Sequence, residues 1–374
     1  MDSSSKLLQA EASGRVSGRR PVGAADPAAP RLPEPRGPLS GAVIDVLRGD
    51  SRCVRFDPAG ADPYGDDLQL ALHLCYELHY HGFESVDPGW EWNPALLRFR
   101  AQLEERFLAA LRRDVAGGDD LDAELEQLIT EPVEATGVGQ FLCDEGRWWQ
   151  VREYFAQRSI YHHKEADPYA WVIPRLRGQA KAALVAVEFD EFGAGRGERV
   201  HARLFADLLD GAGLNSGYLH YLTVTPAPMV ALVNMMSLFG LHREFRGALV
   251  GHFATVEITS PPAARRMVET LRRLAAAPEC VRFYTEHIEA DAVHEQVMRR
   301  DVIGDLLTQE PGLLGSVVFG IQATNLLEEH LERHLLDHSW YAGRSSLRAP
   351  RAPENPEALE NPEALCDSAP VGAD

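Results

Sequence analysis

The chain of 374 residues is short of positive charge: 37 lysines and arginines stand against 56 aspartates and glutamates, for a formal charge of −19. Nucleic acids and anionic membrane surfaces attract basic proteins, so this acidity argues against both as partners. Long hydrophobic runs are missing too, and none reaches the roughly 20 residues that a membrane span needs. The N-terminal segment lacks the apolar stretch of a secretory signal.

Cysteine is scarce, and its five residues are scattered with no Cys-x-x-Cys pair. This spacing argues against a disulfide framework and against a zinc knot. We interpret the cysteines as reduced thiols and predict a cytoplasmic protein. They are Cys53, Cys75, Cys143, Cys280 and Cys366.

Strand signals are sparse, and the best of them, residues 217–228, runs into prolines. Elsewhere apolar residues recur at three- and four-residue spacing, as in 66–83 and 93–115. The second of these begins with Asn93-Pro94, which is typical of a helix N-terminus. Further helices are predicted over 146–163, 168–191, 198–212, 227–240, 242–258, 262–276, 279–300 and 312–337. We therefore predict an all-α fold.

The two ends of the chain are predicted to be disordered tails. Residues 1–38 are rich in proline, alanine, glycine, serine and arginine, and residues 341–374 contain the direct repeat ENPEAL. Such segments bury too little apolar surface to offset the entropy of ordering them. Between the tails we predict an N-terminal helical part over 39–130 and a second domain over 131–340. The acidic, glycine-bearing stretch between these parts is equally compatible with one continuous helical assembly.

A stretch with three glycines, residues 182–205, could be a strand, a glycine loop and a helix, as in a dinucleotide-binding turn. Its glycines follow the pattern G-x-G-x-G instead of G-x-G-x-x-G, and four acidic residues crowd the place of a pyrophosphate. No alternation of strands and helices surrounds it. We therefore exclude a Rossmann fold. The glycines are Gly193, Gly195 and Gly197, and the acidic residues are Glu188, Asp190, Glu191 and Glu198.

Two histidines and an aspartate lie in one predicted helix with the spacing His-x3-Asp-x2-His. They are His287, Asp291 and His294. At about 100° per residue, steps of four and seven residues return close to the same helix face. That face could be a polar stripe in contact with water, as is common on helix exteriors. It could also be half of a metal site, if the rest of the chain supplies matching ligands.

Four further residues fit as ligands. Glu165 precedes a predicted helix, Glu191 ends an apolar segment, His201 follows ten residues later, and Glu257 lies among apolar and small residues. A non-haem diiron site needs carboxylates to balance charge and imidazoles to complete each coordination shell. In helical proteins these ligands project inward from several helices. An unbroken helix would turn His201 about 80° away from Glu191, so we predict that the intervening glycines break it.

These seven residues, in this order, resemble the ligands of the haem-oxygenase-like diiron oxidases and oxygenases, which are described as iron-containing redox enzymes. The resemblance covers about residues 145–338 and implies a haem-oxygenase-like multi-helical bundle. It implies two Fe(II) ions per chain, O2 as co-substrate, and no catalytic residue beyond the metal ligands. The ligands it implies are Glu165, Glu191, His201, Glu257, His287, Asp291 and His294.

The activity that the resemblance implies is oxidation of a small molecule, in the context of specialised metabolism. Relatives oxygenate amine nitrogens or oxidise C–H and C–C bonds. An external electron donor and a second copy of the chain, in a homodimer, are candidate partners. Two rival functions are a non-enzymatic iron- or haem-binding helical protein and a metal-free, thiaminase-like relative, for which Cys143 is the obvious thiol.

Several of these residues also have simpler interpretations. Glu165 could reflect the preference for acidic residues at a helix N-terminus. Glu257 could be a surface carboxylate at a helix end, because two prolines follow it closely. Glu188, one turn before Glu191, could replace it as a ligand or support it.

Two other groups of residues could bind a metal. Glu77 and His81 share a helix face, so a second metal site there is an alternative, although packing and surface roles are the favoured interpretation. His330, His334 and His338 also share a face, but we expect them at the surface of a terminal helix.

Overall fold

The computed structural model describes residues 29–50, 58–130 and 137–349. Within these ranges the regular elements are helices and no strand occurs, so the all-α prediction is confirmed. The α-helices are α1 (Pro38–Arg48), α2 (Asp66–Glu77), α3 (Pro94–Asp114), α4 (Leu121–Ile129), α5 (Val138–Asp144), α6 (Trp148–His162), α7 (Asp167–Ala170), α8 (Gly178–Glu191), α9 (His201–Gly211), α10 (Ala227–Leu241), α11 (Arg246–Arg273), α12 (Pro278–Gln296), α13 (Gly304–Gln309) and α14 (Leu314–Leu335). A π-helix, Val297–Ile303, joins α12 to α13.

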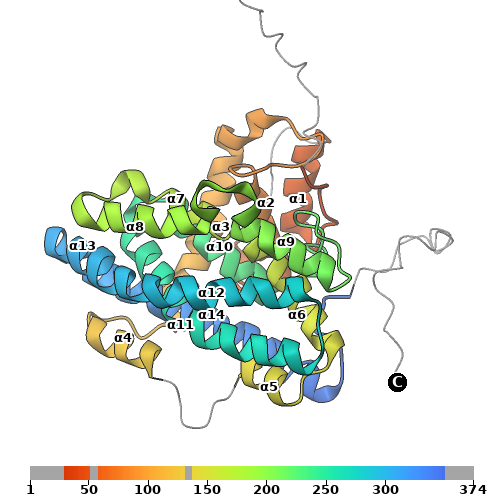
Figure 1. Ribbon diagram of the computed structural model, residues 1–374. Helices are drawn as coiled ribbons and strands as arrows, with labels where there is room; N and C mark the ends of the chain where they lie inside the picture. The colour runs from red at the N-terminus through yellow and green to blue at the C-terminus, as the bar shows by residue number, and fades with distance from the viewer. Residues whose placement is uncertain (1–28, 51–57, 131–136, 350–374) are drawn as a thin grey trace, which may run out of the picture.

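The long helices α11, α12 and α14 form the centre of the bundle, with α11 packed against both of the others. Figure 1 shows α12 crossing the front of the molecule, with α8 and α9 above it and α4 and α5 at the lower edge. Nearly every residue of α10 is buried, because this helix is apolar on all sides and packs against α2, α7, α11 and α14. The apolar α10 therefore belongs to the core, beside α11 and α14.

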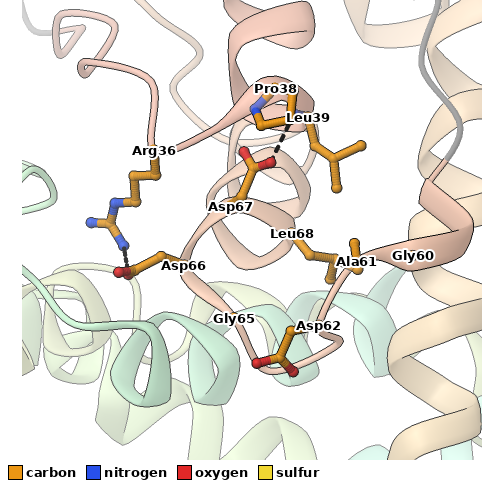
Figure 2. Close-up of a pocket in the computed structure, with 10 residues that line it drawn as sticks. All are labelled: Arg36, Pro38, Leu39, Gly60, Ala61, Asp62, Gly65, Asp66, Asp67 and Leu68. Carbon is orange, nitrogen blue, oxygen red and sulfur yellow. Dashed lines mark hydrogen bonds and ion pairs between the residues drawn. The ribbon is translucent and has the colours of Figure 1, made fainter.

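The predicted N-terminal part packs directly on the rest of the chain, through α2 on α10 and α3 on α14. A cavity of about 470 Å³ lies within the N-terminal part, between the starts of α1 and α2 (Figure 2). Its polar groups already have partners. The Asp67 carboxylate accepts hydrogen bonds from the backbone N–H of Leu39 at 2.9 Å and of Ser40 at 2.8 Å, which caps α1. The Arg36 guanidinium is ion-paired with Asp66 at 3.0 Å. We interpret this cavity as a structural feature of the contact between α1 and α2. The domain division at residue 130 stays a prediction.

Two helix predictions differ from the structure. The stretch 168–191 is not one helix, because α7 ends at Ala170 and α8 begins only at Gly178. Pro174 and the left-handed backbone of Gly178, with φ of +56°, interrupt it. Conversely, the helices predicted over 242–258 and 262–276 form a single helix, α11, with Pro261 and Pro262 inside it.

The continuity of α11 is a consequence of packing. Proline has no N–H, so the carbonyls four residues earlier, of Glu257 and Ile258, lose their helical partners. Both halves of α11 are nevertheless buried, and the helix packs along α12 and α14. Burial of that apolar surface outweighs the local preference to stop.

The predicted tails fall mostly outside the described residues, as do Cys53 and Cys366. Residues 341–349 are described, and Ser346 there is buried and donates a hydrogen bond of 2.8 Å to Glu153. The cysteines of the described ranges, Cys75, Cys143 and Cys280, are free thiols. No helix within these ranges is long and apolar enough to cross a membrane.

Candidate metal centre

Six of the seven predicted ligands lie together in two groups of buried side chains. Within each group, the ligand atoms are all within 4.8 Å of one another. The first ligand group is Glu165, His201 and His287, and the second ligand group is Glu191, Glu257 and His294. They come from the turn between α6 and α7, the end of α8, the start of α9, the middle of α11, and the middle and last turn of α12. Five separate segments therefore converge on one region of the core.

The first ligand group surrounds the Glu165 carboxylate. Its Oε2 lies 3.9 Å from His287 Nε2, and its Oε1 lies 3.1 Å from Nδ1 of His162. Burial alone would raise the pKa of Glu165, but the imidazoles of His162 and His287 lower it to about 2. This carboxylate is ionised. Its Oε2 and His287 Nε2 are buried without a hydrogen-bond partner among the described residues. Buried polar atoms are nearly always satisfied, so this pair fits a shared cation.

The hydrogen bond of His287 determines which of its nitrogens can bind a metal. Nδ1 lies 2.8 Å from the carbonyl oxygen of Phe283, one turn earlier in α12. A carbonyl only accepts, so Nδ1 carries the proton and Nε2 carries the lone pair. The lone pair points toward Glu165. This arrangement is typical of metal-ligating histidines, whose second nitrogen usually donates to a carbonyl or carboxylate.

The second ligand group surrounds His294. Its Nδ1 lies 3.1 Å from Oε2 of Glu257 and 3.8 Å from Oε1 of Glu191, and its Nε2 lies 3.2 Å from Oδ2 of the half-exposed Asp190. Glu257 is 3% exposed and sits in the middle of α11. The interpretation of Glu257 as a surface carboxylate at a helix end is therefore wrong.

The two ligand groups meet where Glu191 contacts His201, with 2.7 Å between Oε2 and Nδ1. Glu191 is the last residue of α8 and His201 is the first residue of α9, with two 3-10 turns between them. The predicted helix break is therefore confirmed. Gly193 has a φ of +71°, and a Cβ on it would lie 2.6 Å from the carbonyl carbon of Arg199 and the nitrogen of Val200. Only glycine fits where the chain folds back to bring His201 beside Glu191.

We expect Gly193→Ala to weaken iron binding at least about tenfold, as changes next to metal ligands commonly do. The methyl group would push Val200 away and move His201 with it, besides the roughly 1–2 kcal/mol cost of a left-handed backbone for alanine. Gly197→Ala is the matched control, because its Cβ would meet no atom within 4 Å. Titration of the metal-free variants with Fe(II) measures both affinities. Equal binding by the two variants would contradict this role of the loop.

Glu188 lies near the second ligand group but is not part of it. It is 2% exposed, and neither of its carboxylate oxygens has a hydrogen-bond partner in the described ranges. Burial, and then the charges of Glu191 and Glu257, raise its pKa to about 9, so it holds a proton in this structure. The group contains Glu191 and not Glu188. Asp291 lies in α12, but its side chain is outside the described structure, so its ligand role stays a prediction.

The donor set of the two groups fits a pair of cations. Three imidazoles and three carboxylates are buried here, and burying a carboxylate is costly unless a positive charge or hydrogen bonds compensate it. Imidazole and carboxylate donors together suit iron and similar transition metals. His162, at the end of α6, supports Glu165, and the sequence offers a signal for this role in the three-residue spacing between them.

The other candidate residues have different surroundings. Glu77 is ion-paired with the buried Lys164, and it accepts a hydrogen bond of 2.9 Å from the Tyr218 hydroxyl. The Lys164 ammonium lies 4.3 Å from the centre of the Tyr80 ring. This buried pair explains Glu77 without a metal. The candidates that join no ligand group in the described part of the chain are Glu77, His81, His330, His334 and His338.

A pocket of about 460 Å³ is lined by residues that neighbour Glu165 and His201 in the sequence, although neither ligand lines it. Val200 and Ala202, which flank His201, line it, as do His163 and Asp167, which flank Glu165. His163 is largely buried, and neither of its ring nitrogens has a hydrogen-bond partner among the described residues. The volume is in the range of small-molecule sites.

Comparison with known proteins agrees with this geometry. Residues 152–329 match the model of a family described as "Iron-containing redox enzyme". The chain is also similar to a nitrosourea synthase of Streptomyces achromogenes subsp. streptozoticus, with 27% identity over 216 residues. That alignment covers 56% of this chain but only 45% of the relative, so this chain spans less than half the length of the relative. The family match includes the positions of all seven predicted ligands and confirms the resemblance predicted from the sequence.

Proposed function

We propose that this chain, as a relative of the iron-containing redox enzymes over residues 152–329, binds two Fe(II) ions and uses O2 to oxidise a small molecule. The observation that carries the proposal is the pair of ligand groups joined by the 2.7 Å contact of Glu191 with His201. Each group offers both imidazole and carboxylate donors, as an iron pair requires. When bound, the iron pair would supply electrons for the reduction of O2.

The chain itself holds the ligands in place and keeps bulk water away from them. The six assembled ligands are all buried. The Phe283 carbonyl fixes the ring of His287, and His162 fixes one oxygen of Glu165, so that the other donor atoms of both residues face the same point. Such preorganisation lowers the cost of binding a cation and of stabilising charge that develops beside it.

The pocket lined by Val200, Ala202 and Asp167 is the place we propose for the substrate. The Asp167 carboxylate, the His163 imidazole and the Arg203 guanidinium offer polar contacts, and the Tyr218 ring provides an apolar wall. A carboxylate in such a wall favours a basic nitrogen, with which it forms a charge-assisted hydrogen bond. Because the relative makes a nitrosourea, which carries an oxidised nitrogen, we propose oxygenation of an amine-type nitrogen in specialised metabolism.

The structure offers less support for the rival functions. Burial, and then the charge of Glu269, raises the pKa of the Cys143 thiol, so this thiol lacks the activation that a nucleophilic cysteine needs. Haem requires an apolar slot for its porphyrin, whereas the imidazoles of His287 and His294 face carboxylates. These observations favour paired iron ions.

Anaerobic loading with Fe(II), followed by exposure to O2, tests the proposal. We expect two irons per chain, rapid O2 uptake and a transient visible absorption band that decays faster when a small amine substrate is present. The metal-free protein provides the baseline. A stoichiometry that stays at one iron or below with excess Fe(II), or the absence of O2 uptake, would contradict a diiron oxygenase.

A further inference from the structure

A chain of three hydrogen-bonded side chains crosses the core near the candidate metal centre. The Thr324 hydroxyl of α14 donates to the carbonyl of Gly320 at 2.7 Å, so its oxygen accepts from Nδ1 of His252 at 2.8 Å. With the proton on Nδ1, the Nε2 atom of His252 has a lone pair. That lone pair accepts the Tyr169 hydroxyl at 3.0 Å. The direction of each hydrogen bond is therefore determined.

Tyr161 lies between this chain of side chains and the first ligand group. The Tyr161 and Tyr169 phenols are close enough for each to shift the pKa of the other. Tyr161 lies one turn before Glu165, and its ring centre is 5.0 Å from that of His162, whose Nδ1 is 3.1 Å from the Glu165 carboxylate. Two neighbouring phenols thus lie between a proposed metal ligand and a histidine deep in the core.

The surroundings of Tyr169 are unusually protected. Its side chain is 1% exposed, His252 is fully buried, and the Tyr169 ring stacks on Phe253 with 3.8 Å between centres and 9° between planes. Water therefore has little access to the phenol or to its imidazole partner. A reactive state of this tyrosine would be shielded from solvent.

A phenol that loses one electron becomes a strong acid, so it gives up its electron readily only when a base can take the proton at once. A neutral imidazole lone pair can do this, whereas a carbonyl oxygen cannot. Tyr284 illustrates the contrast: it lies three residues before His287, yet its buried hydroxyl has no hydrogen-bond partner in the described ranges. Of these two tyrosines near the ligands, only Tyr169 has a base in place.

We propose that Tyr169 is a redox-active residue that donates one electron to the oxidised metal centre through Tyr161, while its phenolic proton moves to Nε2 of His252. The O–H bond of Tyr169 breaks, an N–H bond forms on His252, and a neutral tyrosyl radical remains. The oxidant is the iron pair after reaction with O2, so this inference rests on the function proposed above. Re-reduction by an external one-electron donor returns the proton to the phenol.

The environment makes this electron available only to a strong oxidant. Burial lowers the pKa of His252 to about 3, so the imidazolium formed by the proton transfer is disfavoured. The tyrosine therefore stays reduced in the resting protein. It yields its electron when the oxidised centre has no substrate to attack, which limits damage to the ligands.

Electron paramagnetic resonance after rapid freezing tests this inference. Iron-loaded protein is mixed with O2 without substrate, and iron content and O2 uptake are measured on the same samples. We expect a tyrosyl radical in the wild type, with a spectrum that narrows when the protein contains ring-deuterated tyrosine. Tyr284→Phe, the matched control, should keep the signal. Tyr169→Phe should abolish it, and His252→Gln should reduce it at least tenfold while both variants still bind two irons.

Different outcomes separate the two proposals. O2 uptake by iron-loaded wild type without any radical would overturn the role of Tyr169 and leave the proposed function intact. A radical that persists in Tyr169→Phe would also overturn it. A wild type that binds no iron or consumes no O2 would overturn the proposed function, and this inference with it.

Discussion

His287→Ala should bind one iron in place of two and consume O2 at least about 100-fold more slowly, a loss of the size seen when metal ligands or their immediate support are removed. Nδ1 of His287 donates its hydrogen bond to the Phe283 carbonyl, so Nε2 is the ring nitrogen of this residue that can bind a metal. Nε2 makes no hydrogen bond within the described structure. Truncation should therefore leave the helical fold intact, which circular dichroism would check.

Two variants in the terminal helix α14 are the controls for His287→Ala. His334 Nε2 lies 2.8 Å from the backbone carbonyl of Ser346, and the His330 ring packs 5.0 Å from that of Tyr64. Both histidines thus have structural partners and lie outside the ligand groups. His330→Ala and His334→Ala should keep two irons and full O2 uptake. Iron loss in the His334 variant, together with wild-type iron content in the His287 variant, would show that the wrong histidines had been chosen.

Six of the seven proposed ligands lie together in the structure, and most of them leave a local mark in the sequence. His287 and His294 share a helix face through their spacing of seven residues. Glu257 interrupts an apolar segment. The three glycines between Glu191 and His201 indicate a helix break, which the structure contains. The spacing of polar and apolar residues and the glycine content are properties of short segments, so a single sequence is enough to show them.

Other features depend on contacts between distant segments and leave no such mark. The continuation of α11 through Pro261 and Pro262 depends on its burial against α12 and α14. Local propensity predicts a helix end there, and tertiary packing overrides it. The contacts of Lys164 with Glu77 and of Tyr169 with His252 join residues 87 and 83 positions apart. Only the folded chain shows these pairs.

Glu191 differs from the other carboxylates because it contacts both ligand groups. Its Oε2 lies 2.7 Å from Nδ1 of His201 in the first group, and its Oε1 lies 3.8 Å from Nδ1 of His294 in the second. Glu165 and Glu257 contact histidines of one group each. We therefore expect Glu191 to serve both metals, with Glu165 and Glu257 each serving one.

Removing the carboxylate of Glu191 should therefore abolish the binding of both irons. Two divalent cations held close together repel each other strongly in a buried site, and an anion between them offsets that repulsion. Glu191→Ala should bind close to no iron, whereas Glu165→Ala and Glu257→Ala should each retain about one, because one imidazole–carboxylate set stays complete in each. Iron content after anaerobic loading and desalting measures the difference.

Asp190→Ala is the matched control for Glu191→Ala, since it removes the neighbouring acid from the same end of α8. The Asp190 side chain is 54% exposed and contacts the Nε2 atom of His294 at 3.2 Å. Its loss should leave two irons bound, although more weakly, because both ligand groups remain complete while His294 loses a supporting carboxylate. One tightly bound iron in Glu191→Ala would mean that the two groups bind metal independently, and Glu191 would then belong to the second group alone.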